Sequence, residues 1–351
     1  MIKFPGLIDP HVHLREPGAV HKEDWQSGTA AALAGGFTTV FAMPNTQPSI
    51  IDQETFNQVE IAAKNKALCD YAHFLGAGPE NTQTSQGLAS NTIGLKMYLN
   101  QTFGTLRLDD MDLWAAHFRN WPKDKPIAIH AEGHTLAAAI TFAAVYDRPI
   151  HLCHISLREE IHLIRDAKEQ GLPITCEVTP HHLFLSEKDI PTIGAGRAEV
   201  RPILATEEDQ QSLWDNLEYI DCFATDHAPH TLEEKDSQKP PPGFPGLETA
   251  LPLLLTAIHA GRLTQEDIIL RCYTNPRKIY KLPEQPETWI EVDPDARYQI
   301  SAKNHFSRCG WTPFEDVPVQ GSVERVIIRG EEVFHNGQIL VKPGFGINIS
   351  K

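Results

Sequence analysis

The segment that indicates both the fold and the chemistry of this chain is residues 6–15, which read Gly6-Leu7-Ile8-Asp9-Pro10-His11-Val12-His13-Leu14-Arg15. The apolar run over residues 4–8 predicts a short buried strand, and two histidines separated by one residue follow it. In an extended chain, residues i and i+2 face the same side, so the imidazoles of His11 and His13 face one point. This arrangement is typical of metal ligands, although polar residues at a strand end are often merely solvated.

The composition is that of a globular protein acting on a small molecule. The chain has 351 residues, 41% of them hydrophobic and 22% charged, which suits one large α/β domain with an appendage. A net charge of -15 argues against nucleic acid and anionic membranes as partners, because like charges repel. No apolar run approaches the roughly 20 residues of a membrane span, and the N-terminus has no secretory pattern. The six scattered cysteines include no CxxC motif, so we expect reduced thiols and a cytoplasmic location.

Strand-like and helix-like runs alternate along the first 225 residues. Eight β/α units in series predict an α/β fold of the closed (β/α)8 TIM-like type. An open doubly wound sheet is the alternative, but no Gly-rich phosphate loop follows an early strand. The predicted strands are residues 4–8, 37–43, 69–77, 93–99, 126–131, 149–155, 173–179 and 222–225.

The pattern changes beyond Pro283. Short alternating strands are separated by turn residues, and the Asn336-Gly337 pair is a strong hairpin signal, so we expect a small C-terminal β appendage. The predicted division is residues 5–284 for the barrel, and residues 1–4 with 285–351 for the small β subdomain. The Pro-rich loop over residues 240–246 follows the eighth strand and is predicted to cover the barrel mouth rigidly.

Polar residues follow the predicted strands at their carboxyl ends, where barrel enzymes carry their active sites. One such histidine alone is more often a hydrogen-bonded core residue, but here five strand ends converge on one mouth. Four imidazoles and a carboxylate are ligands that zinc selects, and they suffice for two ions if another anionic ligand bridges them. The candidates are His11, His13, Lys96, His130, His154 and Asp226.

Lys96 lies inside an otherwise apolar predicted strand, where an unpaired ammonium is costly to desolvate. Burial favours the neutral amine, which can add carbon dioxide to form a carbamate. The carbamate would be an anionic oxygen ligand able to bridge two metals. An internal ion pair is the alternative explanation.

These residues together resemble the binuclear amidohydrolase superfamily. More narrowly, residues 5–18, 42–46 and 226–231 resemble dihydroorotase. Residues 246–249 and 275–277 resemble the dihydroorotase type fused to carbamoyl-phosphate synthetase and aspartate transcarbamoylase in the animal multifunctional pyrimidine-synthesis protein. The resemblance covers nearly the whole chain. Because the chain starts almost at the first barrel strand, we expect a domain taken from a longer protein.

The resemblance implies a role for each site residue. His11, His13 and Asp226 would hold one zinc, His130 and His154 the second, and a carboxylated Lys96 would bridge them. The implied substrate carboxylate ligands are Arg15, Asn45 and His230, with Arg201 and Pro242 lining the pocket. The planar fork of an arginine matches a carboxylate bidentately. Arg15 could instead be a surface residue, and Asn45 only a turn former.

Two further features carry alternatives. The loop over residues 100–104 resembles the family's mobile lid, with Thr102 and Phe103 closing over substrate, or it is an ordinary polar loop. Cys153 and Glu177 end neighbouring predicted strands. They could orient His154 or hold an additional metal, giving two or three zinc ions per chain, or Cys153 could be merely structural.

The implied reaction is the reversible cyclisation of N-carbamoyl-L-aspartate to L-dihydroorotate in de novo pyrimidine (UMP) synthesis. Hydroxide formed between two zinc ions would attack the ring amide, with Asp226 as general base and then general acid. Acidic conditions should favour synthesis and alkaline conditions hydrolysis. The alternatives are another cyclic amidase (dihydropyrimidinase, hydantoinase or allantoinase) and a non-catalytic scaffold; Arg15 argues against the first two amidases. The family commonly forms homodimers, and the helices predicted near residues 109–120 and 157–170 have faces that could pair.

Overall fold

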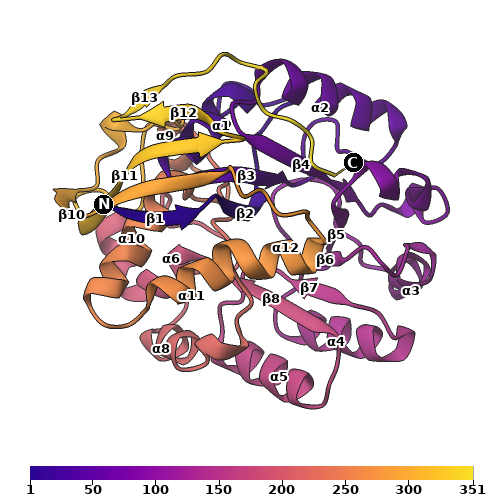
Figure 1. The fold of residues 1–351 in the computed structure, drawn as a ribbon. Helices are drawn as coiled ribbons and strands as arrows, with labels where there is room; N and C mark the ends of the chain where they lie inside the picture. Colours follow the sequence, from indigo (N-terminus) through magenta and orange to yellow (C-terminus); the bar gives the residue numbers. More distant parts are fainter. Residues whose placement is uncertain (351) are drawn as a thin grey trace.

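Eight parallel strands form the central sheet of the computed structural model, which describes residues 1–350. Their spatial order is their order in the chain, and helices surround them (Figure 1). The closing edge is held by the parallel bridge between Val12 and His227 and by the side chain of Asp9, which accepts from the Thr225 N–H at 3.1 Å. The predicted barrel is therefore confirmed. The strands are β2 (Leu7–Val12), β3 (Phe37–Ala42), β4 (Asp70–Gly76), β5 (Gly94–Tyr98), β6 (Ile127–His130), β7 (Ile150–Leu152), β8 (Ile174–Val178) and β9 (Cys222–Phe223).

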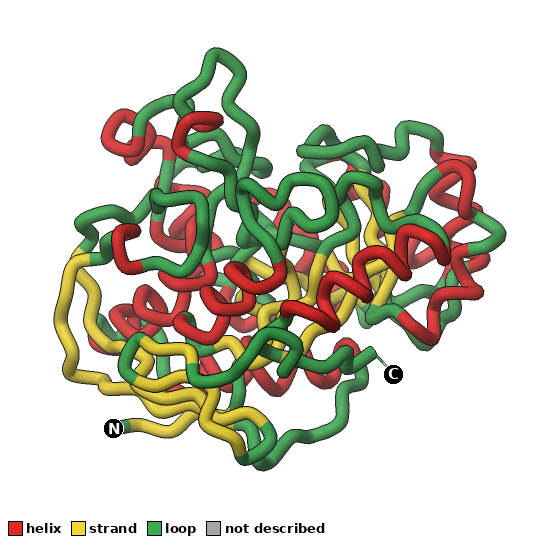
Figure 2. Tube along the Cα trace, turned by 90° about the horizontal axis from the view of Figure 1, so that it is seen from above, coloured by secondary structure: helices red, strands yellow, loops and turns green. Residues whose placement is uncertain are grey.

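The longer helices cover the outside of the barrel, as the view in Figure 2 also shows. Parallel strands covered in this way read as continuous apolar runs, which is why the alternation is visible in the sequence. Several helices begin at a side-chain cap: Asp24, Asp52 and Thr206 each accept from the backbone N–H three residues later. The helices of eight or more residues are α1 (Trp25–Ala34), α2 (Gln53–Lys66), α3 (Met111–Asn120), α4 (His134–Tyr146), α5 (Arg158–Glu169), α8 (Glu207–Asp215) and α10 (Leu247–His259).

Shorter helical segments fill the connections. The 3-10 turns are η1 (Pro79–Asn81), η2 (Ser85–Asn91), η3 (Glu187–Asp189), η4 (Leu217–Tyr219) and η6 (Ala302–Asn304), and η5 (Leu270–Thr274) is a π-helical turn. The short α-helices are α6 (Pro180–Phe184), α7 (Ile190–Ile193), α9 (Leu232–Lys235), α11 (Gln265–Ile269) and α12 (Asn275–Tyr280). Within residues 1–350, no helix combines the length and apolarity that crossing a membrane requires.

The bounds predicted for the first strand were wrong. Residues 4–8 belong to two strands: β1 (Ile2–Pro5) pairs outside the barrel, and the barrel strand is β2, which includes His11. The break is at Gly6, whose N–H donates to the Thr288 carbonyl at 3.0 Å. A Cβ at Gly6 would lie 2.5 Å from the side chains of Thr288 and Thr38. The apolar run could not reveal this division because both strands are apolar.

A second, five-stranded antiparallel sheet packs beside the barrel near the N-terminus (Figure 1). Its strands are β1, β10 (Trp289–Gln299), β11 (Pro318–Ile328), β12 (Glu331–His335) and β13 (Gln338–Ile339), in that order. Asn336 and Gly337 join β12 to β13 with φ angles of 47° and 76°, the left-handed conformation that a tight hairpin requires. The predicted β appendage is thus confirmed. Its Trp311 indole donates to the His230 carbonyl at 2.8 Å, so the appendage contacts the barrel mouth.

Candidate active site

A cavity opens at the carboxyl ends of the barrel strands. Most of the residues proposed from sequence for metal, substrate and lid roles line it, whereas Lys96, Cys153, Glu177 and His230 are not among the lining residues. Arg15, His154 and Asp226 have left-handed backbones, with φ of 61°, 37° and 46°. Such conformations are uncommon for non-glycine residues and concentrate at functional sites. The lining residues are His11, His13, Arg15, Asn45, Tyr98, Thr102, Phe103, His130, His154, Arg201, Asp226, Ala228, Pro242 and Gly243.

His11, His13 and Asp226 form one group of candidate metal ligands. The Oδ1 atom of Asp226 lies 3.0 Å from His13 Nε2 and 3.3 Å from His11 Nε2, and all three residues are buried. Burial lowers the pKa of His13 to about 4. Although burial alone would raise the pKa of Asp226, His11 and His13 hold it well below its usual range. At neutral pH the group therefore offers a neutral imidazole and a carboxylate, which are metal-binding forms.

His130 and His154 form a second group. His130 Nδ1 lies 2.9 Å from His154 Nε2. Burial lowers the pKa of both imidazoles, and His130 lowers the pKa of His154 further, so both rings are neutral at pH 7. Among residues 1–350, the other ring nitrogen of His154, Nδ1, has no hydrogen-bond partner. Two neutral ring nitrogens converging at this distance fit a shared metal ion.

Lys96 is fully buried on β5. Its ammonium donates to the Cys153 thiol at 2.8 Å and lies 5.1 Å from the centre of the Tyr98 ring. Neither neighbour is a carboxylate, so these contacts do not support the internal ion pair considered as the alternative.

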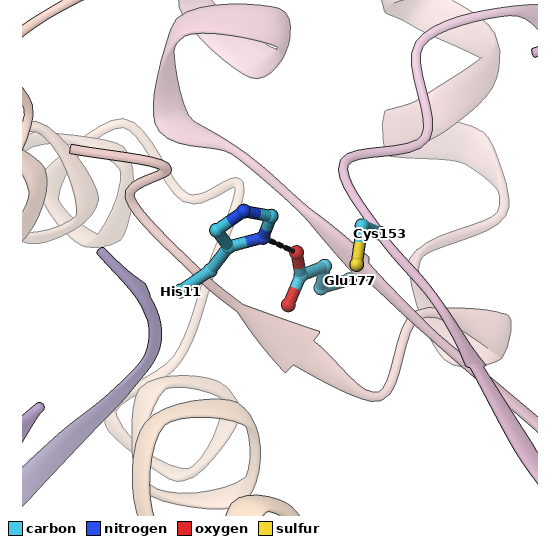
Figure 3. Close-up of side chains that lie close together, drawn as sticks. All are labelled: His11, Cys153 and Glu177. Carbon is cyan, nitrogen blue, oxygen red and sulfur yellow. Dashed lines mark hydrogen bonds and ion pairs between the residues drawn. The ribbon is translucent and has the colours of Figure 1, made fainter. Parts of the chain in front are cut away.

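His11, Cys153 and Glu177 come together on the other side of the His11 ring (Figure 3). His11 Nδ1 is hydrogen-bonded to Glu177 Oε1, and the second oxygen of Glu177 lies 3.0 Å from His151 Nε2. One ligand atom from each of the three residues falls within 4.8 Å of the others. The histidine that Glu177 orients is therefore His11, and not His154 as expected from the sequence. The sequence did not reveal the contact of His151 with Glu177, because a polar residue alternating with apolar ones is ordinary in a strand.

Arg15 and Asn45 are buried, so the surface role considered for Arg15 is excluded. Arg15 Nε donates to the Pro229 carbonyl at 3.0 Å, and Arg15 Nη2 lies 3.0 Å from His230 Nε2. Asn45 Oδ1 lies 2.6 Å from His13 Nδ1, while its amide donates to the Phe103 carbonyl at 2.9 Å. Asn45 thus orients a candidate metal ligand and also fixes the loop above it.

The remaining pocket residues lie on loops. Pro242 accepts from His230 Nε2 at 3.0 Å through its carbonyl, and Arg201 pairs with Glu199 at 2.5 Å beside the cavity. Thr102 and Phe103 line the cavity, and the Phe103 ring centre is 5.1 Å from the Arg15 guanidinium carbon. The loop predicted as a lid therefore lies over the pocket.

Sequence reasoning missed three residues around the cavity. Tyr98 lines it, and its buried hydroxyl has no hydrogen-bond partner among residues 1–350. Tyr98 could have been found, because it follows Lys96 by two residues on the same strand and so faces the same side. Lys22 and Lys235 are buried and follow no periodic pattern. Lys235 Nζ donates to three carbonyls, those of Glu199, Pro241 and Gly243, at 2.6, 3.0 and 3.2 Å.

Sequence comparison relates the chain to three named proteins. A family model described as dihydro-orotase-like matches residues 1–82. The chain is 57% identical to the multifunctional protein pyr1-3 of Dictyostelium discoideum and 55% identical to the multifunctional protein CAD of Squalus acanthias. Each match covers 99% of this chain but only 16% of the relative's length. The chain is also 37% identical to the dihydroorotase of Pyrococcus furiosus, over 97% of this chain and 83% of that protein.

Two solved structures share the fold over almost the whole chain. The L-hydantoinase (dihydropyrimidinase) of Arthrobacter aurescens has a TM-score of 0.92 at 24% identity, covering 100% of this chain and 89% of that one. The inactive dihydroorotase-like domain of the Chaetomium thermophilum CAD-like multifunctional protein has a TM-score of 0.85 at 29% identity, covering 99% of both chains.

Proposed function

The chain belongs to the dihydroorotase family, and on that premise we propose that it catalyses the reversible cyclisation of N-carbamoyl-L-aspartate to L-dihydroorotate in de novo pyrimidine synthesis. One observation carries the proposal. Two groups of buried histidines with a carboxylate face a cavity whose other wall holds the buried guanidinium of Arg15. The first set suits hydrolytic metal ions, and the second suits the carboxylate that both substrate and product carry.

We propose zinc as the metal, with His11, His13 and Asp226 holding one ion and His130 and His154 the other. Bound zinc would supply a water of lowered pKa and polarise the scissile carbonyl. Asp226 is ionised and lies against the metal-facing nitrogens of His11 and His13, so its carboxylate can accept a proton and return it to the leaving ring nitrogen. Asn45 and Glu177 hold the His13 and His11 rings in orientation.

The bridging ligand in this proposal is Lys96 after addition of carbon dioxide. The addition requires a neutral amine at Lys96, which is fully buried among a thiol, an aromatic ring and strand backbone. The group of His11, Cys153 and Glu177 offers a third zinc site with an imidazole, a carboxylate and a thiol, and because burial raises the pKa of this thiol, zinc would have to displace its proton.

Substrate selection is assigned to the loops. Arg15, Asn45 and His230 would hold the substrate carboxylate, while Arg201 and Pro242 line the same pocket and Phe103 covers it. Dihydropyrimidinase and hydantoinase substrates carry no such carboxylate, so a buried arginine without a permanent anionic partner would be costly in their pockets. Likeness to the hydantoinase concerns the fold alone.

The second candidate function is a non-catalytic scaffold, because one structural relative is an inactive dihydroorotase-like domain. This chain carries all six proposed ligands, which argues for chemistry. The test measures zinc content together with hydrolysis of L-dihydroorotate at alkaline pH and cyclisation of N-carbamoyl-L-aspartate at acidic pH, with dihydrouracil and allantoin as comparison substrates. Turnover of the first pair alone supports a dihydroorotase. Metal with turnover of another amide would indicate a neighbouring amidase, and neither metal nor turnover would indicate the scaffold.

The assembly is also a proposal. The relatives that match at 57% and 55% identity are multifunctional proteins, so we propose that this chain works beside carbamoyl-phosphate synthetase and aspartate transcarbamoylase domains. We further propose a homodimer, a cytoplasmic location consistent with six free cysteines, and a division into a barrel over residues 5–284 and a β subdomain of residues 1–4 and 285–351.

A further inference from the structure

Lys22 is a buried lysine beside the pocket, and it has no role in the reaction proposed above. It is 5% exposed and lies in the irregular segment before α1. Its ammonium lies 3.0 Å from His230 Nδ1 and 3.0 Å from Glu234 Oε1. Glu234 balances its charge, so the ammonium is an anchored donor directed at one nitrogen of the His230 ring.

This contact decides which nitrogen of His230 carries the proton. An ammonium has three N–H groups and no lone pair, so it can only donate, and Nδ1 must be the bare nitrogen that accepts. His230 is fully buried, and burial together with Arg15, Lys22 and Lys235 lowers its pKa, so the ring is neutral and has one N–H. That N–H is therefore on Nε2, which lies 3.0 Å from the Pro242 carbonyl, a ready acceptor.

The opposite tautomer is disfavoured by two of the three contacts of the ring. An Nδ1–H would point at the ammonium of Lys22, which would place two donors together. A bare Nε2 would face the carbonyl oxygen of Pro242, which would place two acceptors together. Only Arg15, whose Nη2 lies 3.0 Å from His230 Nε2, would gain an acceptor. That gain would occupy a guanidinium N–H that the substrate carboxylate needs.

We propose that Lys22 is a positioning residue, which holds His230 in the Nε2–H tautomer so that the imidazole does not compete with the substrate carboxylate for the guanidinium of Arg15. The inference rests on the proposed function, because it assumes a substrate with a carboxylate at Arg15. In this state Nε2 offers no lone pair to Arg15, because its N–H donates to the Pro242 carbonyl, so the guanidinium N–H groups remain available to an anion.

Lys22 also lies 4.8 Å from the centre of the Phe103 ring, so its loss could act through the loop above the pocket instead. The two routes differ in what they do to His230. Loss of the cation–π contact alone, as in Phe103→Leu, leaves the tautomer unchanged. Loss of the Lys22 ammonium removes the constraint on Nδ1.

The experiment combines imidazole 15N NMR with steady-state kinetics on the zinc-loaded full chain. The protein is labelled at histidine, and His230→Gln assigns the His230 signals. We expect an Nε2–H signal pattern in the wild type and in Phe103→Leu. Lys22→Met should shift His230 toward the Nδ1–H form, while Lys22→Arg, which keeps a cationic donor, should restore the original pattern.

In kinetics, Lys22→Met should raise KM for N-carbamoyl-L-aspartate by about 10-fold, the equivalent of one hydrogen bond, with kcat changed less than about 3-fold and zinc content unchanged. An Nδ1–H tautomer in the wild type, or an unchanged tautomer in Lys22→Met, would overturn the proposal whatever the activity. Absence of turnover in the zinc-loaded wild type would instead overturn the proposed function, with the tautomer still readable by NMR.

Discussion

The two walls of the cavity are built in different ways. We call the proposed metal ligands the metal wall; they are His11, His13, Lys96, His130, His154 and Asp226, which lie on barrel strands or directly after them. We call the residues proposed to bind the substrate carboxylate the carboxylate wall; they are Arg15, Asn45 and His230, which lie on loops and are held by contacts among segments far apart in the chain. Under the proposed function, the strands would fix the place of the chemistry and the loops would fix which substrate reaches it. Variants in the two walls should therefore fail in different ways.

The largest effect is expected for Lys96→Ala on the metal wall. Removal of the amine removes the proposed bridging carbamate, so zinc should fall below one ion per chain and activity should fall by more than about 10³-fold. A short carboxylic acid such as propionate should restore part of both, because it can occupy the space left by the side chain. Metal analysis and turnover on one sample check this. Full zinc content and full activity in Lys96→Ala without added carboxylic acid would show that Lys96 is not a metal ligand.

Asp226→Asn should come next. Asparagine accepts the left-handed backbone at this position, where φ is 46°, so the fold should be kept. The amide cannot take up the proton that the carboxylate transfers, and kcat should fall by about 10³-fold. Circular dichroism provides the control for folding. Retention of more than a tenth of the wild-type kcat would show that another group moves the proton.

Arg15→Met tests the carboxylate wall and should leave the metal wall intact. Loss of a charge-assisted hydrogen bond costs about 2–3 kcal/mol, so kcat/KM should fall roughly 30- to 150-fold, mainly through KM. Arg15→Lys should recover a minor part, because a lysine lacks the planar fork. Zinc content should equal that of the wild type. Loss of zinc from Arg15→Met would show instead that the carboxylate wall and the metal wall depend on each other.

The smallest effect is expected for Lys235→Met, which acts on the loop behind the carboxylate wall. Burial lowers the pKa of Lys235 from 10.5 to about 7. Between these pH values the unfolded chain holds a proton that the folded protein has released, so the free energy of unfolding should rise with pH by up to about 1.4 kcal/mol per unit from this group.

Lys235→Met should remove that slope, and the loop change should raise KM only a few-fold. Urea unfolding between pH 7 and 10.5 measures the slope, with Lys239→Met as the matched control because Lys239 lies four residues on and is exposed. Identical slopes in the wild type and Lys235→Met would show that Lys235 is charged throughout this range.

The two walls also differ in how far the sequence predicts them. Buried parallel strands read as apolar runs, so the barrel and the strand ends carrying the metal wall could be located from periodicity alone. The first predicted strand was the one assigned partly to the wrong sheet, because Gly6 divides a single apolar run between two sheets. Local patterns do not reveal which sheet a strand joins.

The carboxylate wall could be named only by resemblance, and its supports could not be named at all. Lys22 and His230 are separated by 208 residues, and Lys235 binds carbonyls up to 36 residues away. The contact of Glu177 with His11 spans 166 residues. Such pairs arise only once the barrel brings the loops together, because nothing in the local sequence of Lys22 distinguishes it from an exposed lysine.

The most direct test of the division into two walls is a crystal structure of the zinc-loaded protein with L-dihydroorotate bound. We predict that the ligand carboxylate is bonded to Arg15, Asn45 and His230, and that its ring amide carbonyl lies on the side of His11, His13 and Asp226. A ligand bound the other way round, or a carboxylate held away from Arg15, would contradict the account.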